Sequence, residues 1–414
     1  MRIAIIGGGI AGLGAAYLLS RAHDVVVYEA EPRLGGHTHT HRVERAGCTV
    51  DVDSGFIVFN PDHYPNLIRL FKELDVATQP TTMSFSMKNE ISGLEYNATD
   101  VNRLFCQRRN ILSPYFWGMV RGILRFYREA PALLDVSGPG PTLGDYLKAH
   151  RYSEGFAHDH LIPMASALWS SPASQVLDFP AKYLVQFMAN HRMLDAGNRP
   201  PWSVVSGGSS RYLDRLTPKI RGEFRLASKV RTITRTSAGV AVQTADDVSR
   251  FDHVVLACHS DQALAMLAQP SAAEREVLGA IAYQRNDTVL HTDTSLLPKR
   301  RAAWAAWNAL RFQGGEGACT VSYSMNLLQS LATPEQYVVT LNATRRIDPA
   351  KIIARMDYAH PIYTHASVAA QARFDEINNV SGISYCGAYW GWGFHEDGLR
   401  SGVRVAERLG VSWT

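Results

Sequence analysis

The sequence lacks a charge excess large enough to select a binding partner. Its 414 residues hold 42 Lys and Arg against 38 Asp and Glu, a formal net charge of +4. A nucleic-acid-binding protein usually carries a clustered basic excess, so the composition argues against nucleic acid as a partner. Hydrophobic residues at 46% and charged residues at 19% are ordinary for a folded protein and exclude a disordered chain.

Cysteine is scarce, and no Cys-x-x-Cys pair occurs. The cysteines are few, odd in number and far apart: Cys48, Cys106, Cys258, Cys319 and Cys386. Such a set argues against a disulfide framework and against a cysteine zinc site, and it fits a reducing compartment.

Long hydrophobic runs are missing as well. The longest apolar stretch, Ile3–Leu19, is interrupted by glycines and preceded only by Met1 and Arg2. These features argue against a signal peptide or a membrane anchor, because both need an uninterrupted apolar core. We therefore expect a cytoplasmic protein without a spanning helix.

The start of the chain contains a strand, a glycine turn, a helix and a second strand. We expect the strands at Arg2–Ile6 and Asp24–Tyr28 and the helix at Ala11–Arg21. This order and spacing are typical of a βαβ unit with parallel strands.

The turn of this unit carries the G-x-G-x-x-G spacing of a dinucleotide-binding motif. Gly7 permits the tight turn, Gly9 lets the backbone approach a pyrophosphate, and Gly12 lets the helix pack closely on the strand. The N-terminus of the helix offers free N–H groups to the phosphates. Glu29, just after the second strand, would accept hydrogen bonds from ribose hydroxyls.

The residues after Glu29 favour FAD over NAD. Residues 29–36 read Glu-Ala-Glu-Pro-Arg-Leu-Gly-Gly, an E-A-x-x-R-x-G-G extension that resembles the flavin amine oxidase superfamily, which includes amine oxidases, protoporphyrinogen oxidase and phytoene desaturases. The resemblance runs over residues 1–60, 204–260 and 382–410. It implies a non-covalently bound FAD, held by Gly7, Gly9, Ile10, Ala11, Gly12, Glu29, Ala30, Arg33, Gly35, Gly36, His37, Gly55, Phe56, Val230, Gly387 and Glu396.

The same resemblance implies an α/β fold of two parts. A discontinuous Rossmann-type FAD-binding domain would comprise residues 1–80, 204–262 and 378–414. A mixed α+β substrate domain would comprise residues 81–203 and 263–377.

Candidate reactive residues are few. His395 lies in the turn that, in the family, faces the flavin, and its ordinary pKa near neutrality suits a general acid or base; a structural role stays equally open. His37, His39 and His41 alternate, but we expect no metal site because the first follows the glycines that the family places at the flavin phosphates. Four aromatic residues could line an apolar cavity or lie in the core: Trp304, Trp307, Phe312 and Tyr323.

Residues 52–60, 290–293 and 387–398 are similar to a narrower bacterial group. Its members are associated with cyclopropane-fatty-acid-synthase-like methyltransferases, which implies such an enzyme as a functional partner and an unsaturated or methylated fatty acyl chain as the substrate. The expected activity is hydride transfer to FAD, as an oxidoreductase or a double-bond isomerase. A flavin amine oxidase that releases hydrogen peroxide and a non-catalytic flavin-binding protein are the alternatives.

Between Val101 and Arg128 the chain has six arginines and no Asp, Glu or Lys. Arg121, Arg125 and Arg128 recur at helical spacing and would share one face. This pattern suggests peripheral contact with the anionic inner membrane surface, and a merely solvated basic face is the alternative.

Overall fold

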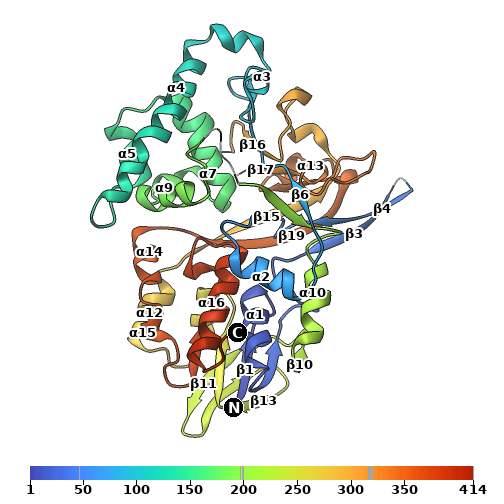
Figure 1. Cartoon of the computed structure of the whole chain (residues 1–414), viewed down its shortest axis with the longest axis vertical. Helices are drawn as coiled ribbons and strands as arrows, with labels where there is room; N and C mark the ends of the chain where they lie inside the picture. Colours follow the sequence, from blue (N-terminus) through green and yellow to red (C-terminus); the bar gives the residue numbers. More distant parts are fainter. Residues whose placement is uncertain (46, 196, 198–199, 316–319, 414) are drawn as a thin grey trace.

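The computed structural model describes residues 1–414 apart from 46, 196, 198–199, 316–319 and 414. Within the described residues, five strands form a parallel sheet in the order β10-β2-β1-β14-β20, in the lower half of Figure 1. The bounds are β1 (Arg2–Ile6), β2 (Asp24–Tyr28), β10 (Gly222–Arg225), β14 (His253–Leu256) and β20 (Ile383–Tyr385).

The position of β1 determines where a ligand can bind. β2 pairs with one edge of β1 and β14 with the other, so the strand order reverses at β1. In open parallel sheets, ligands bind outside the carboxyl ends of the strands at such a point. The strand–helix–strand prediction is confirmed, with both strands at the expected bounds and the helix α1 at Ile10–Leu19.

Helices α1 and α16 (His395–Arg408) pack against each other beside this sheet. Their backbones approach so closely that a Cβ on Gly402 would lie 2.3 Å from the carbonyl oxygen of Ala11. Nearly all of α1 is buried as a result. The α/β class is confirmed.

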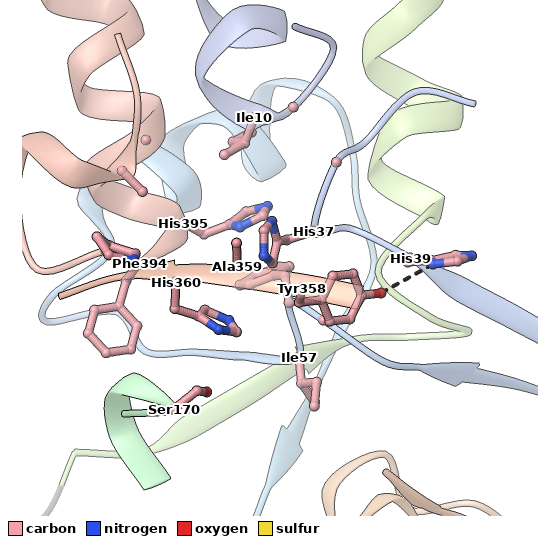
Figure 2. A pocket seen from close by; sticks show the side chains of 18 of the residues that line it. Ile10, His37, His39, Ile57, Ser170, Tyr358, Ala359, His360, Phe394 and His395 are labelled. Atoms are coloured by element: carbon pink, nitrogen blue, oxygen red, sulfur yellow. Dashed lines mark hydrogen bonds between the residues drawn. The ribbon is translucent and has the colours of Figure 1, made fainter. Parts of the chain in front are cut away.

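A second large sheet lies toward the other end of the molecule. It has seven described strands in the order β19-β15-β18-β17-β16-β7-β8, antiparallel except where β16 meets β7. The strands are β7 (Phe85–Asn89), β8 (Leu94–Asn97), β15 (Tyr283–His291), β16 (Trp307–Arg311), β17 (Val321–Ser324), β18 (Val338–Leu341) and β19 (Ile352–Pro361). The long edge strand β19 contributes to the cavity described below, where Figure 2 shows its residues Tyr358, Ala359 and His360.

Three small sheets complete the described strands. They contain β3 (Thr40–Arg45) with β4 (Cys48–Asp53); β5 (Val58–Phe59) and β6 (Thr78–Thr81) on either side of β9 (Trp202–Val205); and β11 (Thr232–Thr236), β12 (Gly239–Gln243) and β13 (Val248–Phe251).

A helical layer with its own apolar core covers the end of the molecule farthest from the chain termini (Figure 1). It contains α4 (Pro114–Glu129), α5 (Leu143–Ala149), α6 (Glu154–Phe156), α7 (Ile162–Trp169), α8 (Ala173–Leu177) and α9 (Ala181–Asn190). The remaining α-helices are α2 (Pro65–Glu73), α3 (Val101–Leu104), α10 (Arg211–Leu216), α11 (Ser260–Met266), α12 (Ala272–Gly279), α13 (Met325–Leu328), α14 (His365–Gln371) and α15 (Phe374–Ile377). No helix of the described part of the chain is both long enough and apolar enough to cross a bilayer.

Candidate functional site

A cavity of about 1470 Å³ opens at the carboxyl end of β1 and extends to the seven-stranded sheet. Its wall combines the glycine turn, the turn before α16 and the strand β19. Sites for one small ligand usually enclose roughly 300–1,000 Å³. The cavity therefore has room for a dinucleotide and a second molecule.

Three glycines of the first turn have different surroundings. Gly7 has φ +117°, a conformation that side chains disfavour. A Cβ on Gly12 would lie 2.0 Å from the carbonyl oxygen of Gly7, so this glycine allows the helix to touch the turn. A Cβ on Gly9 would meet no atom within 4 Å, because this face of the backbone borders the open cavity. Gly9 thus leaves space for a phosphate beside the N-terminus of α1.

The Glu29 carboxylate is held at the cavity wall by two backbone donors. Its Oε2 accepts from the N–H of Gly8 at 2.7 Å, and its Oε1 accepts from the N–H of Glu31 at 2.9 Å. A carboxylate that is fixed but retains free lone pairs can still accept from the hydroxyls of a ribose. Glu29 lies just after the end of β2 in the cavity wall, and its binding of the ribose stays a prediction.

Arg33 stiffens the loop that lies over the glycine turn. Its guanidinium donates to the carbonyls of Gly36 at 2.9 Å and Thr38 at 3.1 Å, and the N–H of Gly35 donates to the carbonyl of Gly8. The arginine and the positive end of α1 favour an anionic group between them. Together with the space at Gly9 and the position of Glu29, this arrangement fits the pyrophosphate and ribose of FAD.

His395 is locked in a buried polar triad. Its Nε2 lies 3.0 Å from both the Thr38 hydroxyl and the Tyr212 hydroxyl, and its ring stacks on Phe56 with the centroids 3.7 Å apart. Burial, with a smaller contribution from the nearby His37, lowers its pKa to about 3. The imidazole is therefore neutral at physiological pH, and within the described residues its Nδ1 is the ring nitrogen without a hydrogen bond.

The sequence reasoning missed the residues that β19 brings to the cavity. The centroid of the His37 ring lies 4.9 Å from that of Tyr358 and 5.3 Å from that of His360. Figure 2 shows the three side chains side by side. Burial lowers the pKa of His37 to about 4 and that of His360 to about 3, so both are neutral. The alternation of Met356, Tyr358 and His360 is the signal that could have placed them on one strand face.

Most of the predicted FAD-binding residues line this cavity. They are Gly7, Gly9, Ile10, Ala11, Glu29, Ala30, Arg33, Gly35, Gly36, His37, Gly55, Phe56, Val230 and Gly387, and His395 joins them. Gly12 lies beneath the turn. The Glu396 carboxylate is directed away from the cavity and accepts from the backbone N–H groups of Asn66 and Leu67, at the start of α2.

The four aromatic residues, the cysteines and the histidines named from the sequence are placed as follows. Trp307 and Tyr323 line the cavity, whereas Trp304 and Phe312 do not. Four of the five cysteines are described and are free, and Cys319 lies outside the described residues. In the same part of the chain, no three His, Cys, Asp or Glu side chains converge as metal ligands.

The family model described as "Flavin containing amine oxidoreductase" matches residues 10–291. The match covers more than half of the chain, and the chain belongs to this family. It is an enzyme family that binds FAD, so FAD is the cofactor that the cavity accommodates.

Two kinds of relative illustrate the spread within the family. The chain is 28% identical over 271 residues to a protein of Mycobacterium tuberculosis described as "Putative flavin-containing monoamine oxidase AofH"; the match covers 62% of this chain and 56% of that protein. The chain thus spans little more than half the length of this curated relative. It is also 28% identical over 280 residues to "Carotenoid phi-ring synthase" of Streptomyces griseus, where the match covers 62% and 52% of the two chains.

Solved structures share the fold over nearly the whole chain. Cyclohexylamine oxidase from Brevibacterium oxydans has a TM-score of 0.70 at 17% identity, and the CLA-producing fatty acid isomerase from P. acnes has 0.70 at 16% identity. In both comparisons the match covers 99% of each chain. At this identity the likeness concerns the fold alone.

Proposed function

We propose that this protein is a FAD-dependent oxidoreductase or double-bond isomerase that acts by hydride transfer on an unsaturated or methylated fatty acyl chain. The observation that carries the proposal is the apolar wall of the cavity beyond the FAD-binding turns. This wall is formed by Met83, Phe85, Met164, Ala167, Leu168, Trp307, Tyr323, Leu341 and Met356. Such a surface favours an alkyl chain, because burial of apolar area drives its binding.

The same wall offers little to a protonated amine. Outside the segment that holds the FAD ribose, Asp357 is the acidic residue among the described residues of the wall, and its carboxylate pairs with the Arg285 guanidinium. A cationic substrate would therefore lack a free carboxylate partner. Relatives named as amine oxidases keep amine oxidation with release of hydrogen peroxide as the second candidate.

Each group of the site then has a task. We propose that the glycine turn and Arg33 bind the pyrophosphate, Glu29 the ribose, and Gly55, Phe56 and Gly387 the flavin. FAD supplies two-electron oxidation by accepting a hydride. The apolar wall excludes water and orients the alkyl chain. Thr38 and Tyr212 hold the ring of the neutral His395, whose lowered pKa favours a positioning role over proton transfer.

The test is anaerobic mixing of the purified flavoprotein with three kinds of compound: phospholipids or free acids with cis-unsaturated chains, saturated chains of equal length, and primary amines. We expect the unsaturated chains alone to bleach the flavin or to yield products with a shifted double bond, detected by mass spectrometry. Bleaching by amines together with unchanged acyl chains would replace the proposal by amine oxidation. A protein that binds FAD but converts neither class would be a non-catalytic flavin binder.

We also propose that the protein works with a cyclopropane-synthase-like methyltransferase, and this partnership can be tested in cells. Membrane fatty acids would be compared with and without this protein, each in the presence and absence of a cyclopropane-synthase-like methyltransferase. We expect a new or depleted acyl species that depends on both proteins.

A further inference from the structure

A solvent-facing stripe runs along α4. Trp117, Arg121, Leu124 and Arg128 recur at intervals of four, three and four residues, so they share one helix face, and all four are exposed. Just before the helix, Leu112 is 87% exposed, and Leu124 within the stripe is 59% exposed. Trp117 is 37% exposed and the centroid of its ring lies 5.4 Å from that of Phe105, whereas the opposite face of α4 is buried.

We call Ile111, Leu112 and the four stripe residues the α4 surface. Ile111 belongs to it because its carbonyl accepts a hydrogen bond from the indole N–H of Trp117 at 2.8 Å and its side chain is exposed. The surface lies at the end of the molecule opposite the chain termini in Figure 1. The opposite face of α4 packs on β7, β8 and β16 of the seven-stranded sheet through Phe116 and Met119.

The charge around this surface is positive. Arg121 forms no ion pair with a described residue, and the chain from 101 to 128 contains no acid. More cations adjoin it, because the 3₁₀ helix that begins at Arg301 packs on α3, and Lys299, Arg300 and Arg301 are exposed. The acids near this surface are mostly paired: Glu129 with Arg125 and Arg128, Asp100 with Arg103, and the buried Asp159 with Arg311. The exposed Glu154 carboxylate lies 3.2 Å from the His158 ring.

The structure changes the arginine set that the sequence suggested. Arg125 turns toward the protein: it bonds the Glu129 carboxylate at 2.7 Å and the His150 carbonyl at 2.9 Å, and its guanidinium covers the Tyr152 ring. Arg121 and Arg128 remain on the solvent face, interleaved with Trp117 and Leu124. The exposed face is therefore amphipathic rather than purely basic.

We propose that the α4 surface docks on an anionic lipid bilayer. Tryptophan prefers the bilayer interface, exposed leucine and isoleucine side chains insert below it, and arginines bind phosphate groups there. An excess of arginines over acids fits an anionic bilayer and gives an uncharged one no advantage. Tyr127, which follows Leu124 by three residues in α4, lines the cavity. Docking would therefore bring the cavity close to the bilayer. Docking of the α4 surface does not depend on which substrate the enzyme converts.

The test is flotation of the FAD-loaded protein with vesicles of phosphatidylcholine alone and with one-third phosphatidylglycerol. We expect flotation with the anionic vesicles and little with the neutral ones, reduced by salt. Arg121→Gln with Arg128→Gln should weaken partitioning roughly fivefold per charge. Trp117→Gln with Leu124→Gln should weaken it at unchanged net charge.

The matched control is Arg215→Gln with Lys219→Gln, which removes the same charge from exposed positions of α10 and the turn after it. All variants should keep the flavin absorbance and melting temperature of the wild type. Three results would overturn the proposal: wild type that does not float with anionic vesicles, variants that float like wild type, or a control that weakens binding equally. Loss of self-association in the Trp117 and Leu124 variant, without vesicle binding by the wild type, would instead identify a second copy as the occupant.

Discussion

Two glycines that stand three positions apart have opposite surroundings at the cavity. A Cβ on Gly12 would meet the backbone of Gly7 at 2.0 Å, whereas one on Gly9 would meet nothing within 4 Å. The first is needed for the protein to pack, and the second borders the space that the FAD pyrophosphate would fill. Substitutions at the two positions should therefore separate folding from cofactor binding.

We expect Gly9→Asp to fold normally but to bind FAD roughly tenfold or more weakly, because a carboxylate would occupy the phosphate space beside the start of α1. We expect Gly12→Ala to lose about 1–3 kcal/mol of unfolding free energy through overpacking. Flavin absorbance and urea unfolding of the apoproteins measure the two effects. A Gly9 variant with wild-type FAD affinity, or a Gly12 variant of unchanged stability, would contradict the assignment.

The sequence predicted the residues of the glycine turn because their geometry is local. Gly7, Gly9, Gly12 and Glu29 lie within one βαβ unit, and spacing alone determines their relation. The group around His37 could not be predicted in this way. Tyr358 reaches it from β19, more than 300 residues later, and only the pairing of two long strands sets its position.

At the scale of elements, one helix depends on another for its N-terminal cap. α2 has no side-chain cap of its own and no acid in its first turn. The Glu396 carboxylate of α16 takes the place of both the cap and the acid. It accepts hydrogen bonds from the backbone N–H groups of Asn66 and Leu67 at 3.1 and 2.9 Å, and from the Asn66 side-chain amide at 2.6 Å. Sequence reasoning placed Glu396 at the cofactor from family pattern; its contact with α2 joins segments 330 residues apart and has no local signal.

We expect Glu396→Ala to lower the unfolding free energy by about 1–3 kcal/mol, because it leaves the buried N–H of Leu67 and the partly buried N–H of Asn66 without an acceptor. Glu407→Ala, on an exposed position of the same helix, should change it by less than about 0.5 kcal/mol. Urea unfolding of both variants measures the difference. Equal stability of the two variants would show that the cap contributes nothing.

At the scale of the whole molecule, the division into two domains stays a prediction. The strands of the parallel sheet come from residues 2–28, 222–256 and 383–385, and those of the seven-stranded sheet from 85–97 and 283–361. The chain therefore passes from one sheet to the other several times. The local βαβ spacing predicted only the first pair of parallel strands, β1 and β2. Residues of both large sheets line the cavity, so the charges around the cavity come from both parts of the chain.

Buried neutral histidines are the main electrostatic feature at that scale. Burial is the largest cause of a pKa lowered to about 3 or 4 at His37, His39, His191, His253, His259, His291, His360 and His395. Burial raises the pKa of Asp53 and Asp397 to about 6, which acts in the opposite direction. The histidines outnumber these two carboxyls and should dominate the response to acid.

The unfolding free energy should therefore fall as the pH falls from 6.5 toward 5, because the unfolded chain binds protons at histidines that the folded protein keeps neutral. His253 and His291 lie outside the cavity wall, so His253→Gln with His291→Gln removes part of this effect without touching FAD. Between pH 6 and 5 the wild type should lose about 2 kcal/mol more than the double variant, each histidine contributing up to about 1.4 kcal/mol per pH unit. Urea unfolding at pH 7, 6 and 5 with saturating FAD measures both slopes. Equal slopes for the wild type and the double variant would show that the pKa values of His253 and His291 are not lowered in the folded protein.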